Sequence, residues 1–309
     1  MFSAKSQMDD KIEGFEAGVD DYITKPIHPA DLIASVKKLM ERPQYAAQDA
    51  PSEPVVEQTA NADVTGVISA KSGIGVTTLA VNFALALREF AQGEVAVVEC
   101  HPGMGDLALY LGLPKDAHKL DELLKRNTAD IKQRDVEEHL SSYQRILKIL
   151  PASRNYENVG LTQAVAQFEA TIEALKHVVP NIVLDLGAGI NDLKRKALRG
   201  VDRVVVVVEP TPHVVVHTKQ LIEDLQAIGV SVNRIKPVMM STQRLELSLA
   251  AQQVQQGIGA KLQGVIAPAP EIAFQAIMRQ QPLVMQEADS ITARQIRKLV
   301  QTCLDGVEA

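Results

Sequence analysis

Apolar runs rich in β-branched residues recur along most of the chain and predict the strands of a single sheet. They cover the first half of residues 64–80 and residues 94–98, 145–150, 181–186, 203–208 and 235–239. Patterns of helical period lie between them, for example at residues 162–178 and 213–228. Strands that alternate with helices predict an α/β fold with a doubly wound, mostly parallel sheet covered on both faces. A ligand of such a sheet binds at the carboxyl ends of the strands.

Residues 1–42 have a different pattern and predict a unit of their own. Apolar residues at helical spacing between residues 8 and 15 predict a helix that Gly18 ends. Residues 20–26 then predict a short strand that ends at a proline, and a second amphipathic helix has its apolar face within residues 32–39. This short βα segment precedes the main α/β domain.

The next stretch, residues 43–63, contains three prolines among Gln, Ala, Ser, Glu and Asn and has no periodic apolar face. Such a composition predicts a flexible linker. We therefore divide the chain into a partial N-terminal segment at residues 1–42, a linker at residues 43–63 and a main domain at residues 64–309.

Composition and charge exclude some classes of function. The 309 residues are 46% hydrophobic and 23% charged, which is typical of a soluble globular protein. A net charge of −6 gives no overall attraction to DNA or anionic lipid. Aromatic residues make up 4% and Trp is absent, which argues against base-stacking platforms for nucleic acid. Two distant cysteines and the lack of a long apolar run predict a cytoplasmic protein without stable membrane insertion.

The segment 64–80 joins a predicted strand, a glycine-rich loop and a predicted helix, which is the arrangement of a phosphate cradle. Residues 70–77 match the P-loop pattern G-x-x-x-x-G-K-[ST], except that Ala70 replaces the first glycine and Val76 replaces the lysine. The hydroxyls of Thr77 and Thr78 stand where a helix N-terminus needs them, and Thr77 can ligate Mg²⁺. We expect ATP and Mg²⁺ as cofactors. The residues expected to bind the nucleotide are Lys71, Ser72, Gly73, Ile74, Gly75, Val76, Thr77 and Thr78.

Val76 removes the main cation of the P-loop, because an apolar side chain makes no charge-assisted contact with the phosphates. That contact is worth about 1.5–3 kcal/mol. If nothing substitutes for it, nucleotide affinity falls by about tenfold to a hundredfold or more. Restoring lysine at Val76 should then strengthen ATP binding by roughly tenfold or more.

Residues 71–78 read Lys-Ser-Gly-Ile-Gly-Val-Thr-Thr and resemble the deviant P-loop, K-G-G-x-G-K-[ST]-T, of the MinD/ParA superfamily of dimerising ATPases. The resemblance implies a homodimer in which Lys71 reaches across to the phosphates of the partner. Lys71 is therefore the one candidate catalytic residue, and it would act in trans.

The resemblance continues into the first switch of that superfamily. Residues 105–108 read Gly-Asp-Leu-Ala and match its pattern, as does Leu111. The two acidic positions of the switch have become Glu99 and His101. The resemblance gives those carboxylates the task of organising Mg²⁺ and the attacking water, so their replacement predicts an ATPase activity that is weak or lost.

Asp185 ends the apolar run at residues 181–186 and resembles the Walker B aspartate, which faces Mg²⁺ through water. Met240 and Ser241 stand where relatives carry the Asn-Arg pair that reads the base. Asp185 and Thr77 are thus the expected metal ligands, and only when nucleotide binds.

Two further stretches carry charge or apolar periodicity without a specific motif. Residues 194–199 hold the densest basic cluster, which we interpret as a solvated helix face and not as a DNA-binding surface. The last helical pattern, at residues 291–304, resembles a membrane-targeting helix only weakly, and we expect it to pack on the core.

The N-terminal segment resembles the last third of a two-component receiver domain. Residues 3–5 read Ser-Ala-Lys, and residues 16–26 read Glu-Ala-Gly-Val-Asp-Asp-Tyr-Ile-Thr-Lys-Pro. The resemblance makes Ser3 the switch hydroxyl, Tyr22 the switch aromatic and Lys25 the phosphate-sensing lysine. No phospho-acceptor Asp precedes Ser3, so phosphotransfer cannot occur in the chain as given. Either the protein starts before Met1, which we favour, or the half-domain packs on a second copy or on the main domain.

A receiver-like segment joined to a deviant MinD/ParA domain resembles the CpaE/TadZ family, which localises and helps to assemble the Flp/Tad type IV pilus or secretion apparatus. The resemblance implies pilus and secretion assembly proteins as partners, and recruitment to the cell pole or the inner membrane face. We favour a dimerising assembly factor with decayed chemistry. Two alternatives stay open: an ATP-driven switch that uses Lys71 in trans, and an output protein controlled by a full receiver domain.

Overall fold

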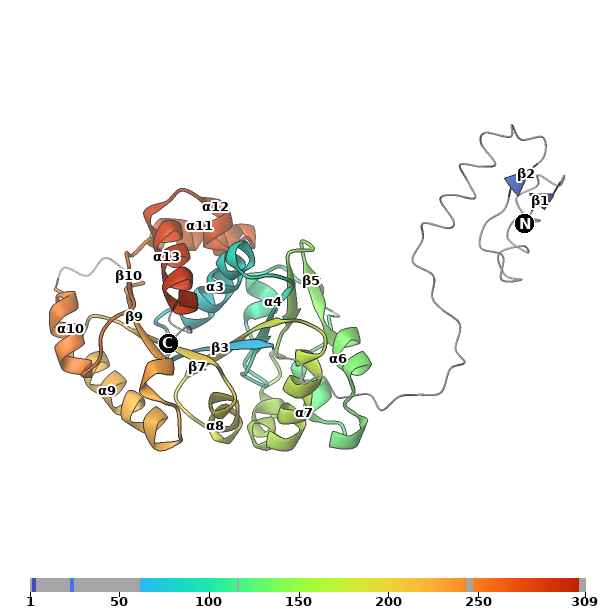
Figure 1. Ribbon diagram of the computed structural model, residues 1–309, viewed down its shortest axis with the longest axis horizontal. Coiled ribbons are helices and arrows are strands. Elements are labelled where there is room, and N and C mark those ends of the chain that lie inside the picture. The colour runs from blue at the N-terminus through green and yellow to red at the C-terminus, as the bar shows by residue number, and fades with distance from the viewer. Residues whose placement is uncertain (1, 4–22, 25–61, 116, 243–246, 306–309) are drawn as a thin grey trace. The chain divides into compact units, whose positions relative to one another are not determined.

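The structure is a computed structural model, whose described residues are 2–3, 23–24, 62–115, 117–242 and 247–305 (Figure 1). The chain divides into two compact units, Met1–Gln58 and Thr59–Ala309. In the first unit, β1 (Phe2–Ser3) pairs in parallel with β2 (Ile23–Thr24), and Ser3 lies opposite Thr24. The strand predicted at residues 20–26 is thus present at its centre.

Other predictions for the N-terminal segment lie outside the described residues. These are the switch residues Tyr22 and Lys25, the two predicted helices and the linker up to residue 61.

The second unit is built on an eight-stranded sheet, counted over its described residues, in the order β10-β9-β8-β3-β7-β4-β6-β5. Neighbouring strands are parallel except β5, which is antiparallel to β6. The strands are β3 Asp63–Ser69, β4 Val95–Glu99, β5 Ser141–Tyr143, β6 Leu147–Leu150, β7 Asn181–Ala188, β8 Arg203–Val208, β9 Ile235–Met240 and β10 Gly264–Ile266. The order puts β3 between β7 and β8, so the predicted P-loop leaves the middle of the sheet.

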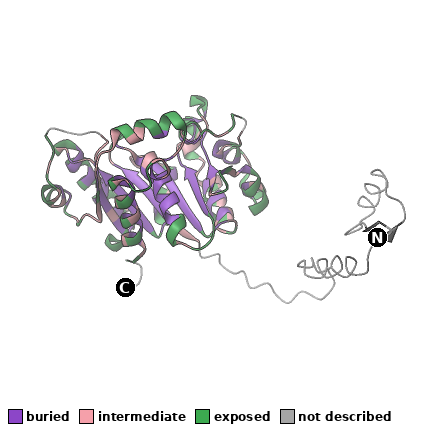
Figure 2. Cartoon of the chain, turned by 90° about the horizontal axis from the view of Figure 1, so that it is seen from above, coloured by how far each residue is buried: buried purple, intermediate pink, exposed green. Residues whose placement is uncertain are grey.

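Helices cover both faces of this sheet (Figures 1 and 2). One face carries α3 (Val76–Phe90), α11 (Pro270–Arg279), α12 (Leu283–Gln286) and α13 (Ile291–Asp305). The other carries α7 (Val165–Lys176), α8 (Asp192–Arg199) and α9 (Pro212–Ala227). The remaining helices and 3₁₀ turns are α4 Leu107–Tyr110, α5 Leu120–Leu124, α6 Gln133–His139, α10 Ala251–Ile258, η1 Thr128–Asp130, η2 Tyr156–Gln163 and η3 Val232–Arg234. The doubly wound, mostly parallel α/β fold predicted from the sequence is confirmed.

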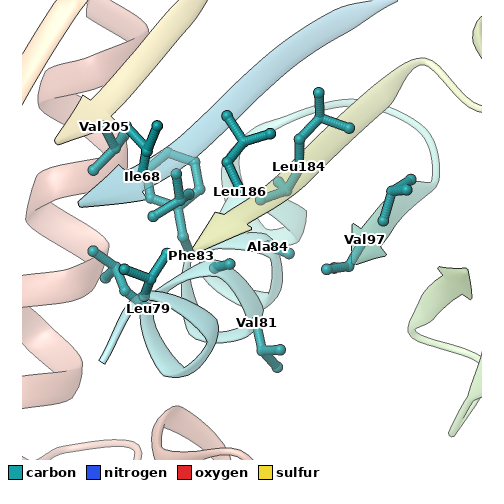
Figure 3. Close-up of a cluster of buried hydrophobic side chains, with 14 of the residues drawn as sticks. Ile68, Leu79, Val81, Phe83, Ala84, Val97, Leu184, Leu186 and Val205 are labelled. Carbon is teal, nitrogen blue, oxygen red and sulfur yellow. The ribbon is translucent and has the colours of Figure 1, made fainter. Parts of the chain in front are cut away.

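The core lies between α3 and the sheet. Figure 3 shows Leu79 and Phe83 of α3 in one cluster with Ile68 of β3 and Leu186 of β7, and all four are buried. Burying a Leu, Ile or Phe side chain stabilises the fold by about 1.5–3 kcal/mol. The helix that follows the P-loop is therefore fixed by packing along most of its length.

The apolar pattern predicted most elements, with three differences. All six predicted strands are present, but β5 and β10 were not predicted, because three residues each are too few for a periodic pattern. The helix predicted at residues 162–178 begins at Val165, after the 3₁₀ turns of η2. The helix α3 begins at Val76, so Thr77 and Thr78 lie in its first turn as predicted, but its N-cap is Gly75 in the left-handed conformation and no side chain caps it.

The predicted linker includes Asp63, whereas the structure has Asp63 as the first residue of β3. Its carboxylate accepts two hydrogen bonds from the guanidinium of Arg203, one of them at 2.7 Å from Nη2. Arg203 is 1% exposed and also donates to Thr65 Oγ1 at 2.9 Å. This buried ion pair closes the amino end of the central strand against β8.

The last helix packs on the core, as predicted. In α13, the buried side chains include Ile296, Leu299, Val300 and Cys303. Among the described residues, no helix is both long enough and apolar enough to cross a membrane.

Candidate functional site

The loop after β3 has the backbone of a phosphate cradle. Gly73 and Gly75 have φ values of +81° and +90°, which side chains rarely tolerate. A Cβ built on Gly73 would meet no atom within 4 Å, so the loop is open there. A Cβ built on Gly75 would lie 2.9 Å from Met240 Cε, so the end of β9 closes the loop on the other side. Ser69 Oγ donates to the Lys71 carbonyl at 2.7 Å and holds the start of the turn.

Neither Val76 nor Lys71 places a free cation in this loop. Val76 is 7% exposed and belongs to the hydrophobic core. Lys71 is exposed, and its Nζ lies 2.9 Å from Nε2 of His213, the second residue of α9. Since a lysine ammonium only donates, Nε2 of His213 accepts this hydrogen bond.

Asp185 offers an acceptor that the protein does not use. Its side chain is fully buried near the carboxyl end of β7, beside the P-loop strand. Oδ1 accepts from the Gly187 N–H at 3.1 Å, whereas Oδ2 has no hydrogen-bond partner among the described residues. Buried carboxylate oxygens normally have a partner, so an unpartnered one fits a cation or its water ligand. The predicted role of Asp185 toward Mg²⁺ is compatible with this geometry.

Glu99 holds the switch backbone and is not available to solvent. It ends β4, is 2% exposed, and lies opposite Asp185 in the sheet register. Its Oε1 accepts from the N–H groups of Asp106 and Leu107 at 2.7 and 2.9 Å, and Oε2 accepts from Ala152 N–H at 2.9 Å. Burial, followed by the negative charge of Asp185, raises the pKa of Glu99 to about 8. Glu99 thus joins the start of α4 to the segment that follows β6.

His101 completes a small polar cluster with Glu99 and Asp185. Each of the three offers one ligand atom within 4.8 Å of the others. The His101 ring covers Gly187, since a Cβ there would lie 1.9 Å from Nε2. Burial lowers the pKa of His101, which keeps the ring neutral. The sequence placed Glu99 and His101 in one switch and Asp185 in another motif, and the fold brings all three together.

The sequence analysis did not identify Lys194 as a cation beside this cluster. We interpreted residues 194–199 as a solvated face, and for Lys194 this was wrong: it is 6% exposed and donates from Nζ to the Ala188 carbonyl at 2.9 Å. Burial lowers its pKa, whereas the charges of Cys100 and Asp185 raise it. The amphipathic pattern of α8 was the available signal, because Lys194 shares the buried face with Ala197 and Leu198.

These residues fit part of an ATP·Mg²⁺ complex. The open loop at Gly73, the half-buried Thr77 and the unpartnered Oδ2 of Asp185 suit a phosphate with its metal ion. The apolar Val76 and the buried Glu99 do not, because they supply neither the usual cation nor a carboxylate that faces water.

Comparison with known proteins agrees with this geometry. The family model described as cellulose biosynthesis protein BcsQ matches residues 63–304. The chain belongs to this family. An uncharacterized ATP-binding protein of Methanocaldococcus jannaschii is 28% identical over 240 residues, which are 75% of this chain and 84% of that protein. The septum site-determining protein MinD of Synechocystis is 26% identical over 232 residues, which are 73% and 83% of the two chains.

Solved structures of MinD proteins share the fold. The Pyrococcus horikoshii MinD structure with Mg-ADP has a TM-score of 0.68 and 23% identity, and covers 80% of this chain and 99% of its own. The MinC:MinD complex of Aquifex aeolicus gives a TM-score of 0.64 at 21% identity, with 79% and 96% covered. The BcsQ-family domain thus has the fold of these MinD structures.

Part of the chain also matches a response regulator. The phosphate regulon transcriptional regulatory protein PhoB of Pseudomonas aeruginosa is 45% identical over 53 residues, which are 17% of this chain and 23% of PhoB. The receiver-like resemblance is therefore supported. The roles predicted for Ser3, Tyr22 and Lys25, and for the individual P-loop residues, stay predictions.

Proposed function

We propose that this BcsQ-family protein is a dimerising localisation and assembly factor of the CpaE/TadZ type, whose ATPase activity is weak or lost. Its apparatus would be a Flp/Tad type IV pilus or secretion system. The observation that carries the proposal is the setting of Glu99, which is buried, accepts hydrogen bonds from three backbone N–H groups and has a pKa raised to about 8. A side chain held in this way is poorly placed to orient an attacking water.

The same site supports weak nucleotide binding. The glycine loop and Oδ2 of Asp185 remain suited to phosphate and Mg²⁺, which would be the cofactors. Lys71 would join in trans after leaving His213, so a homodimer would complete the site. Dimerisation driven by bound ATP, with little turnover, would let the protein act as a scaffold with two states.

Two families of apparatus are candidates. The receiver-like match supports the CpaE/TadZ arrangement and hence pilus or secretion partners at the cell pole or the inner membrane face. The name of the matching family model favours a cellulose-producing apparatus as the second candidate. A third role, as an output protein under a full receiver domain, rests on the same N-terminal resemblance.

The apparatus is tested by deleting the gene in the organism that encodes it and scoring pili and cellulose in the same cells. Loss of pili with normal cellulose, restored by the intact gene, is the expected result. Loss of cellulose with normal pili would replace the proposal by the second candidate. Complementation with Lys71→Ala then separates a scaffold from an ATP-driven switch, since a scaffold with decayed chemistry should not need the lysine that would act in trans.

A further inference from the structure

Three potential metal-ligating side chains converge well away from the P-loop motif, between α5 and α6. They are His118, just before α5, Glu122 within α5 and His139 at the end of α6. One ligand atom from each lies within 4.8 Å of the other two. His118 Nδ1 is 2.9 Å from Glu122 Oε2, and His139 Nε2 is 3.6 Å from the same oxygen. The two imidazole centroids are 4.7 Å apart.

The buried histidine of this cluster is oriented by the backbone. The side chain of His139 is 4% exposed, and its Nδ1 lies 2.7 Å from the Asp135 carbonyl. A carbonyl only accepts, so Nδ1 carries the proton and the lone pair of Nε2 points at Glu122. Histidines that bind metals are commonly held in this way, with the second nitrogen donating to a carbonyl.

Glu122 is oriented in the same manner. Its Oε1 accepts from the Lys119 N–H at 3.1 Å as part of the capping of α5, which leaves Oε2 directed at both histidines. His139 Nε2 faces the same Glu122 oxygen at 3.6 Å, which is too long for a good hydrogen bond, so the two atoms face each other without a proton bridge. A metal cation would fill that position.

We propose that His118, Glu122 and His139 form a binding site for Zn²⁺ or a similar divalent transition metal ion, independent of nucleotide. Zn²⁺ binds imidazole nitrogen and carboxylate oxygen at about 2.0–2.2 Å, so two ligands of a tetrahedral ion lie about 3.4 Å apart. The two separations from Glu122 Oε2, 2.9 and 3.6 Å, bracket this value. His118 and Glu122 are 56% and 48% exposed, so a fourth ligand, such as water, can approach from solvent.

The metal would clamp α5 to α6. A metal ion on His118 Nδ1 replaces the hydrogen bond to Glu122, and the neutral ring then carries its N–H at Nε2. The clamp closes the segment between residues 118 and 139, which begins a few residues after the switch helix α4. Its effect is therefore structural, and it leaves the P-loop residues unchanged.

The test is a titration of the untagged full chain, first freed of metal with EDTA, with Zn²⁺ and with Co²⁺ in the absence of nucleotide. The expected result is one equivalent bound at this site, with the visible absorption of tetrahedral Co²⁺. His118→Ala and Glu122→Gln should each weaken binding at least tenfold. Both positions are exposed, and the amide oxygen of Gln keeps the hydrogen bond to Lys119, so folding is preserved.

Two matched variants identify the site. His217→Ala removes an exposed histidine of α9 and should leave binding unchanged. His101→Ala should also still bind one equivalent of metal ion, because His101 belongs to the separate cluster with Asp185. The proposal is overturned if no stoichiometric metal binds, if binding survives both His118→Ala and Glu122→Gln, or if it is lost in His101→Ala.

Discussion

Raising the pH from about 6.5 to 8 should lower the free energy of unfolding of the metal-free protein by about 1 kcal/mol. The cause is Glu99, whose pKa rises from 4.5 to about 8 in the folded state through burial and the charge of Asp185. An acid with a raised pKa contributes stability that is complete below its unfolded pKa. That stability is lost as the pH rises to the folded value, because the unfolded chain has already released the proton.

The size of this change in the free energy of unfolding follows mainly from the single proton on Glu99. Each pH unit over which the folded chain holds one more proton than the unfolded chain lowers the free energy of unfolding by about 1.4 kcal/mol. From pH 6.5 to 8, Glu99 by itself lowers the free energy of unfolding by about 1.6 kcal/mol. His101 and His139 have lowered pKa values in the folded state and offset roughly half of this, because each histidine of the unfolded chain still releases about half a proton above pH 6.5. The buried Cys100 and Cys303 have raised pKa values and matter mainly at higher pH.

The assay is urea unfolding followed by far-UV circular dichroism in EDTA, for the native chain and for Asp185→Asn. The asparagine keeps the acceptor for the Gly187 N–H but removes the charge, so the pKa of Glu99 falls and the pH dependence shrinks. Asp185→Asn should therefore be the more stable protein at pH 8. A native chain whose stability is constant or rises over this window would refute the protonated state of Glu99. Equal slopes in both proteins would refute the contribution of Asp185.

Two further substitutions test the fold around the site. Asp63→Asn leaves the guanidinium of Arg203 buried without its anion and should lower the free energy of unfolding by about 3 kcal/mol. Adding Arg203→Leu to this variant should recover part of the lost stability. If the single and the double variant lose the same stability, the role of the ion pair is contradicted. Gly105→Ala puts a Cβ 2.4 Å from the Ala152 carbonyl oxygen and 2.6 Å from Glu99 Oε2, and should cost about 2–4 kcal/mol. Gly160→Ala is its control, since a Cβ there meets nothing within 4 Å, and it should change stability by less than about 0.5 kcal/mol. Both sets are measured by urea unfolding at pH 7.

The fold could be predicted because its central strands carry their own signal. The run of valines in β8 and the apolar run of β7 are buried on both faces, so they read as continuous β-branched segments. The P-loop motif predicted in addition that a strand, a glycine loop and a helix follow one another around Gly73 and Gly75. Short edge strands such as β5 carry too few residues for such a signal.

The sequence predicted those parts of the candidate site whose residues lie within a single sequence motif. Asp185 and the glycine loop were found, but the tertiary contacts of Glu99 were not, because its partners Asp106, Leu107 and Ala152 are backbone groups. The burial of Lys194 was missed, although its helical spacing from Ala197 and Leu198 places it on the apolar face of α8. His118, Glu122 and His139 meet only because α6 folds back on α5, and their spacing follows no metal-binding motif.

The central claim is that this BcsQ-family domain keeps a phosphate cradle while lacking the groups for efficient binding and hydrolysis. The most direct measurement is calorimetric titration of the full chain and Val76→Lys with Mg²⁺-ATP, with analysis of the product in the same samples. We predict that Val76→Lys binds roughly tenfold or more tightly than the native chain, and that the native chain forms no ADP. Tight binding by the native chain that is lost in Lys71→Ala, together with ADP formation, would contradict the account and identify a working ATP switch.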